Sequence, residues 1–225
     1  MAHRRSSVAG LGTVAAVGAV LGALAALLLT AAPVAAAELA VRVTTAGGEP
    51  VAGAVVTLTG PALTPMTLAE PLVVDQVDET FQPMVTVVLK GGKVTFRNSD
   101  LTRHHVYSFS HARPFELIVP PESSSEPVAL DQSGVVALGC NIHDNMIGWI
   151  IVTDGGPGLV TGPDGVARFP GLPDGPLTAT VWHPRLRPGQ PPPVLDLAMA
   201  GADRVESVSL PLLPARRQDR ERSGY

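Results

Sequence analysis

The chain has 225 residues, a formal net charge of −4 and few aromatic residues, 4% of the total. This length is enough for one or two small domains with a buried core. The only strong charge cluster is the C-terminal segment ARRQDRERSGY, so we expect a disordered tail over 214–225 and no nucleic-acid partner. After residue 37, no apolar run reaches the length of a membrane span.

The first 37 residues resemble an export signal rather than part of the fold. A basic start, MAHRRSSVAG, precedes a long apolar stretch, and the stretch ends in small residues. Ala35, Ala36 and Ala37 fit a cleavage site before Glu38. We expect a cleaved signal peptide over 1–37, a periplasmic or secreted protein and no stable membrane association. An uncleaved membrane anchor is the alternative.

The rest of the chain predicts an all-β fold. Short segments with alternating apolar residues, such as KVTFRN and GVVALGC, stand between turns rich in Gly and Pro, and no amphipathic helix is evident. In KVTFRN, Val94 and Phe96 should face one side of the strand, and Lys93, Thr95 and Arg97 the other. Many such strands are typical of an antiparallel sandwich or barrel.

The two flanks of the chain look like halves of one module. AELAVRVTTAGGEPVAGAVVTLTG comes first, and LVTGPDGVARFPGLPDGPLTATVWHP comes last. Together they resemble the small Ig-like sandwich of the carboxypeptidase-regulatory-like family. We therefore expect a discontinuous domain over 38–60 and 154–213, with a second domain over 61–153 inserted into it. Two consecutive domains are the alternative.

Candidate metal ligands gather in CNIHDNM, where Cys140, His143 and Met146 follow the spacing C-x₂-H-x₂-M in a loop between two strands. Cys140 cannot form an internal disulfide because it is the only cysteine. A thiolate, an imidazole and a thioether together favour copper over zinc or hard cations. A buried, inert cysteine and a methionine that fills the core are the plainer interpretations.

A second histidine is needed, and TFRNSDLTRHHVYSFS offers His104 and His105. Adjacent strand residues point to opposite faces, so we expect only one of them to be a ligand. The pattern F-x-N…H followed by G-C-x₂-H-x₂-M resembles the cupredoxins, the type 1 blue-copper family, with the short cysteine loop of the amicyanins. The block from 71 to 153 also resembles methylamine-utilisation-type cupredoxin-like periplasmic proteins.

The resemblance implies a cupredoxin-like Greek-key β-sandwich with one type 1 copper ion. His104, Cys140 and His143 would form its trigonal plane and Met146 its weak axial contact. His105 would occupy the position whose side chain, in the family, links the two ligand loops by hydrogen bonds. This chain departs from the family by having Arg103, Ile142 and Asp144 where relatives often have proline. The carboxylate of Asp144 would then lie beside His143.

The function implied is electron transfer with a transient redox partner protein. No nucleophile paired with a base is apparent, so we do not expect an enzyme. Copper binding or delivery without redox shuttling is one alternative, and a structural β-sandwich binding module is another. The sequence does not identify the redox partner.

Overall fold

The computed structural model describes residues 37–64 and 71–215, and within these ranges its regular structure is entirely β-strand. In the part of the chain that is described, seventeen strands form four sheets. The expectation of an all-β sandwich fold is confirmed. The predicted signal peptide, except for Ala37, and most of the predicted tail lie outside the described residues. Within the described ranges, no helix could serve as a membrane span.

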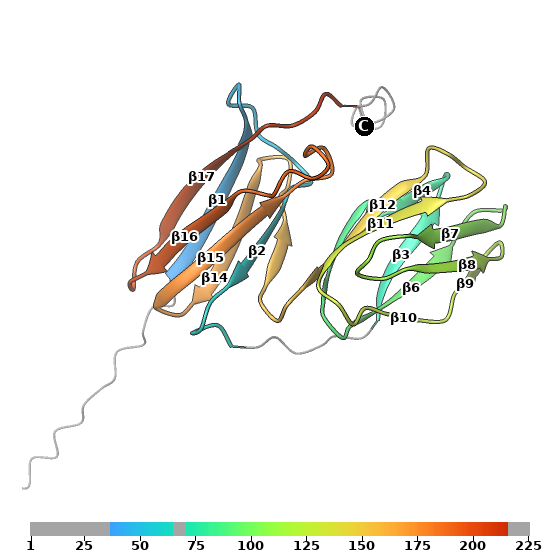
Figure 1. Ribbon diagram of the computed structural model, residues 1–225, viewed down its shortest axis with the longest axis horizontal. Helices are drawn as coiled ribbons and strands as arrows, with labels where there is room; N and C mark the ends of the chain where they lie inside the picture. Colours follow the sequence, from blue (N-terminus) through green and yellow to red (C-terminus); the bar gives the residue numbers. More distant parts are fainter. Residues whose placement is uncertain (1–36, 65–70, 216–225) are drawn as a thin grey trace, which may run out of the picture. The chain divides into compact units, whose positions relative to one another are not determined.

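The middle of the chain forms two five-stranded sheets, which together we call the middle sandwich (Figure 1). Parallel pairing joins β3 to β6 in one sheet and β5 to β12 in the other. The first sheet has the order β10 (Val128–Ala129), β6 (Lys93–Asn98), β3 (Leu72–Val77) and β4 (Thr80–Gln82), with β9 (Ser123–Ser124) also beside β6. The second has the order β5 (Val85–Leu89), β12 (Ile147–Thr153), β11 (Gly134–Cys140), β7 (His104–Ser108) and β8 (Phe115–Val119).

Strands from both ends of the described chain form the other two sheets, which together we call the flanking sandwich. In Figure 1 its colours therefore run from blue to teal and from orange to red. One sheet has the order β14 (Val166–Leu172), β1 (Ala37–Thr45) and β17 (Arg204–Leu210). The other has the order β13 (Gly158–Val160), β2 (Val55–Thr59), β15 (Gly175–Trp182) and β16 (Val194–Met199). Its assignment to the regulatory-like family stays a prediction.

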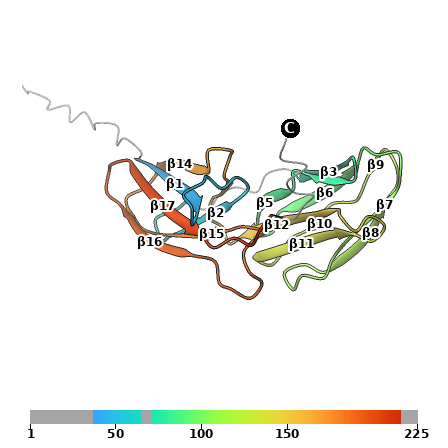
Figure 2. The ribbon, with the colours of Figure 1, turned by 90° about the horizontal axis from the view of Figure 1, so that it is seen from above.

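Each sandwich has its own apolar core, formed by alternate residues of strands in both of its sheets. Figure 2 separates the two layers of the middle sandwich, with β3 and β6 in one and β11 and β12 in the other. In β6, Val94 and Phe96 are fully buried while Lys93 and Arg97 are exposed, as the alternation predicts. This core fixes the ends of β6, β7 and β11, from which the site is built.

Sequence patterns did not indicate every strand. The hairpin of β3 and β4 was not expected, nor were β9, β13 and β16. In β3 the buried residues include Asp75 and Gln76, so a polar pair interrupts the apolar pattern that marks a strand. The hairpin matters for the site because its turn carries Glu79.

Candidate metal centre

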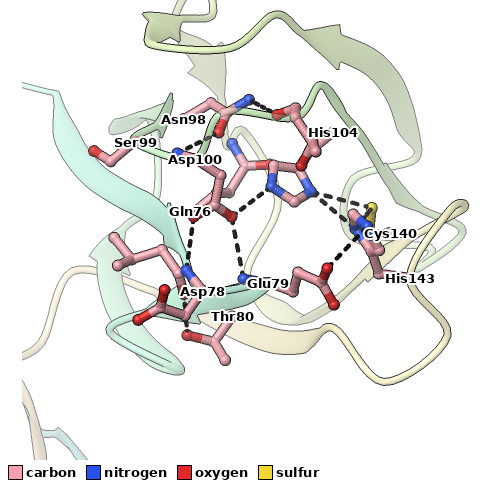
Figure 3. A network of polar contacts seen from close by, with 12 residues as sticks. Gln76, Asp78, Glu79, Thr80, Asn98, Ser99, Asp100, His104, Cys140 and His143 are labelled. Atoms are coloured by element: carbon pink, nitrogen blue, oxygen red, sulfur yellow. Dashed lines mark hydrogen bonds and ion pairs between the residues drawn. The ribbon is translucent and has the colours of Figure 1, made fainter.

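Three of the predicted ligands converge at one end of the middle sandwich (Figure 3). His104 is the first residue of β7 and Cys140 is the last residue of β11, while His143 lies in the loop that leads to β12. Strands β7 and β11 pair antiparallel, with Cys140 opposite Val106, so the start of one strand lies beside the end of the other. Within the described ranges, no other group of three His, Cys, Asp or Glu side chains comes as close together.

The three donor atoms form a nearly regular triangle. The Cys140 Sγ atom lies 3.7 Å from His104 Nδ1 and 3.8 Å from His143 Nδ1, and the two Nδ1 atoms are 3.2 Å apart. The point equidistant from all three lies about 2.1 Å from each atom, close to bond lengths of about 2.0–2.1 Å to nitrogen and about 2.3 Å to sulfur in zinc sites. A first-row metal ion therefore fits between them.

Burial differs among the predicted ligands. The His104 side chain is fully buried, and Cys140 and Met146 are buried in the core of the middle sandwich, whereas the His143 side chain is 20% exposed. The backbone N–H of Met146 donates a hydrogen bond to the His143 carbonyl, which closes the loop between them in a tight turn. Met146 thus shares its core with Cys140, and its axial role stays a prediction.

His105 points away from this cluster. Its Nε2 lies 2.6 Å from the Glu116 carboxylate, and its Nδ1 lies 3.4 Å from the Asn141 side-chain nitrogen. Its carbonyl also accepts a hydrogen bond from the Asn141 backbone N–H. Of the two adjacent histidines, the structure brings His104 to the cluster, while His105 links the loop of Cys140 to β7.

A carboxylate lies behind His104. His104 Nε2 is 2.8 Å from Asp100 Oδ2. The pKa of Asp100 is lowered: burial by itself opposes ionisation, but hydrogen bonds from the Glu79 N–H, from His104 and from the Asp78 N–H outweigh it. Because an ionised carboxylate only accepts hydrogen bonds, Nε2 carries a ring proton, and in the neutral imidazole Nδ1 presents its lone pair to the cluster.

Asp100 also holds the turn between β3 and β4. Its Oδ1 accepts a hydrogen bond from the Asp78 N–H at 2.7 Å, and its Oδ2 accepts one from the Glu79 N–H at 3.1 Å. Asp78 and Glu79 have positive φ angles of 50° and 54°, which residues with a Cβ seldom adopt. One carboxylate thus connects an unfavourable turn to a predicted ligand.

The carboxylate beside His143 is Glu79, not Asp144. Glu79 Oε1 lies 3.4 Å from His143 Nε2. Asp144 is exposed and makes no hydrogen bond or ion pair with His143 or with any other described residue. Adjacency in the sequence suggested Asp144, but a neighbouring residue in a loop can point outward, whereas Glu79 comes from another strand pair.

Asn98 ties the loop of residues 99–103 to β8. Its Nδ2 donates to the carbonyls of Thr102, Val119 and Pro120 at 2.8, 3.0 and 2.9 Å, and its Oδ1 accepts from the Asp100 N–H at 2.9 Å. The Asn98 residue is 1% exposed. The asparagine of the F-x-N motif therefore fixes the loop that places both Asp100 and His104.

Solved structures that are similar to part of this chain include copper proteins. A reduced amicyanin variant is 21% identical over 43% of this chain and 99% of its own length, with a TM-score of 0.34. A copper-containing nitrite reductase from Thermus scotoductus SA-01 is 24% identical over 42% of this chain and 26% of its own length, also with a TM-score of 0.34. No family model and no curated protein matches the sequence. These likenesses concern the fold alone, and the case for a metal centre rests on the side chains.

The donor set can bind a soft or borderline ion. The two Nδ1 atoms are 3.2 Å apart while Nε2 of each histidine faces a carboxylate, so the Nδ1 atoms can share one proton or one metal ion. A cysteine thiolate next to two imidazoles suits copper or zinc. The buried thioether of Met146 in the same core favours copper.

Proposed function

We propose that the protein is an exported copper-binding protein that carries electrons through one type 1 copper ion. The observation that supports this most is the triangle formed by His104 Nδ1, His143 Nδ1 and Cys140 Sγ, whose centre fits a metal ion. Two imidazoles and a thiolate with a nearby thioether are the ligands of blue-copper electron-transfer sites. Export would bring the chain into an oxidising compartment, where the thiolate needs protection by a metal or by burial.

The middle sandwich holds two of the proposed ligands on paired strands. His104 and Cys140 belong to paired strands, and Cys140 is packed among core residues. When bound, copper supplies a one-electron couple between its two common oxidation states. A rigid ligand set changes little between these states, so little rearrangement opposes electron transfer.

His143 offers the route to a partner. Its side chain is 20% exposed, whereas His104 is fully buried. A transient redox partner would therefore dock over the loop 141–145, next to the exposed edge of His143. Electron-transfer interfaces of this kind are small, below about 1,200 Å² of buried surface.

Copper reconstitution of the full chain tests the proposal. We expect one copper ion per chain, an intense visible charge-transfer band and a reversible one-electron potential. The Cys140→Ser variant should lose the band. His111→Gln is a matched control because His111 is an exposed histidine in a turn of the same sandwich, and it should behave as the wild type.

Different outcomes separate the alternatives. Tight binding of Cu(I) without a charge-transfer band or a reversible potential would favour copper delivery over electron transfer. A wild-type protein that binds neither Cu(I) nor Cu(II) would refute both and leave a structural binding module.

A further inference from the structure

Each of the two histidines is backed by a carboxylate, and the two carboxylates belong to one connected network (Figure 3). Asp100 contacts His104, and Glu79 contacts His143. The Asp100 carboxylate also accepts the backbone N–H of Glu79.

The turn over Asp78 and Glu79 depends on Asp100. Two-residue turns with positive φ at both positions are usually made by Asn and Gly, which adopt that region at little cost. Here both residues have a Cβ and positive φ. The hydrogen bonds from both backbone N–H groups to one carboxylate compensate for this unfavourable conformation. Unfavourable backbone geometry of this kind often occurs at functional sites.

The turn of Asp78 and Glu79 also places the Glu79 side chain against His143. Glu79 Oε1 is 3.4 Å from His143 Nε2, although Glu79 and His143 lie in separate strand pairs. If the turn relaxed, the Glu79 side chain would lose its position against the imidazole. A single carboxylate, Asp100, therefore acts directly on His104 and indirectly on His143.

We propose that Asp100 is the positioning residue of the metal centre: it fixes His104 with the proton on Nε2 and, with Glu79, makes the site favour the more highly charged oxidised ion. This inference rests on the proposed copper function. Partners behind ligating histidines orient the ring and raise its basicity, and their loss costs about 10–100-fold in metal affinity.

The two carboxylates should contribute unequally. The Asp100 side chain is 14% exposed and in contact with a fully buried imidazole, so water screens its charge only partly. The Glu79 side chain is 61% exposed, and its contact with His143 is longer. Solvent and salt screen such an exposed charge strongly. Asp100→Asn should therefore change metal binding more than Glu79→Gln.

An asparagine at position 100 cannot replace the carboxylate. Oδ1 and Oδ2 of Asp100 both accept from backbone N–H groups, and Oδ2 also accepts from His104. The amide of Asn has one oxygen, so its NH₂ group must face either the Asp78 N–H or the side shared by Glu79 and His104. If the NH₂ group faces His104, it donates a hydrogen bond to Nε2 and so favours a His104 ring without a proton on Nε2. The ring proton then lies on Nδ1, the atom to which the metal should bind.

The first experiment determines the His104 tautomer in the copper-free full chain by ¹⁵N NMR. We expect the Nε2–H tautomer in the wild type and in Asp144→Asn, a matched control that removes the exposed carboxylate that follows His143 in the sequence. A wild-type His104 with its proton on Nδ1 would overturn the proposal, whether or not the protein binds copper. This measurement on the wild type tests the proposal even if Asp100→Asn does not fold.

The second experiment measures Cu(I) and Cu(II) affinities of the wild type, Asp100→Asn, Glu79→Gln and Asp144→Asn. For Asp100→Asn we expect a loss of about 10–100-fold in Cu(II) affinity and a smaller loss in Cu(I) affinity. Each tenfold loss of Cu(II) affinity relative to Cu(I) affinity raises the reduction potential by about 59 mV. Equal losses for both ions, or the same change in Asp144→Asn, would overturn the proposal. No copper binding in the wild type would instead refute the proposed function.

Discussion

Replacing Asn98 by Asp tests whether its amide holds the first ligand loop in place. The change keeps the size of the side chain and keeps Oδ1 as the acceptor of the Asp100 N–H. It removes both hydrogens of Nδ2, which are shared among the carbonyls of Thr102, Val119 and Pro120. A carboxylate oxygen then faces three carbonyl oxygens in a site that is 1% exposed.

The expected cost follows from these contacts. Two hydrogens serve three acceptors, so the substitution removes two hydrogen bonds, one of which is shared. A lost bond that leaves a buried partner unsatisfied costs about 1–3 kcal/mol, which sums to about 2–6 kcal/mol in the free energy of unfolding. For a chain of this size, 1 kcal/mol changes Tm by about 2–4 °C. A loss of about 4 kcal/mol thus predicts a Tm lower by about 8–16 °C.

Urea and thermal unfolding of the copper-free full chain, followed by circular dichroism, measure this loss. Asn145→Asp is the matched control because Asn145 is exposed in the loop after His143. The control should stay within about 0.5 kcal/mol of the wild type, as surface substitutions usually do. If Asn98→Asp also stayed within that range, the amide would not hold the loop, and our account of how His104 is placed would be wrong.

Three further predictions concern other parts of the chain. Burial opposes ionisation of Asp75, but hydrogen bonds from Arg97, Ser99 and the Gln76 N–H lower its pKa. The contribution of the Asp75 carboxylate to stability is therefore present above about pH 4 and is lost as pH falls through the lowered pKa. Asp75→Asn should therefore lower Tm at pH 7, with a difference from the wild type that shrinks below pH 4; a constant difference would contradict this. A Cβ at Gly156 would lie 1.8 Å from the Leu58 carbonyl oxygen, so Gly156→Ala should greatly reduce the yield of folded protein. Gly47→Ala should not, because a Cβ there would lie 3.6 Å from Thr45 Oγ1, an ordinary contact distance. The Glu38 backbone N–H donates to Asp203 at 2.8 Å, so cleavage before Glu38 would place the new α-ammonium beside that carboxylate. Mass spectrometry of the protein after export should show Glu38 as its first residue. Retention of Ala37 would contradict this prediction.

The strands that follow a regular apolar alternation could be predicted from the sequence. The segments AELAVRVTT, KVTFRN, GVVALGC and IGWIIVT coincide with β1, β6, β11 and β12. The hairpin of β3 and β4 could not, because buried Asp75 and Gln76 break the alternation and its Asp-Glu turn lacks the glycine or asparagine that marks such turns. Its role in the site was therefore not foreseen.

The sequence predicted only part of the candidate site, again because some of its contacts leave no pattern in the sequence. Spacing within one loop indicated that Cys140 and His143 converge, and alternation indicated that one of His104 and His105 joins them. The resemblance to the cupredoxins favoured His104, which the structure brings to the cluster. The groups behind the two histidines are long-range contacts of single side chains, and no periodic pattern reports them. Asp100, four residues before His104, was the one available signal, because a carboxylate near a ligating histidine commonly orients it.

The pairing of β2 with β13 has a consequence for how the chain is assembled. Thr57 lies opposite Gly158, so the middle sandwich is, in topology, the loop of a β-hairpin. Loop-closure entropy grows by only about 0.6 kcal/mol for each doubling of length, and a domain that folds by itself removes even this cost by bringing its own ends together. The chain thus leaves the flanking sandwich after β2 and returns to it at β13 at neighbouring positions, so the long insertion adds little entropic cost to the folding of that sandwich.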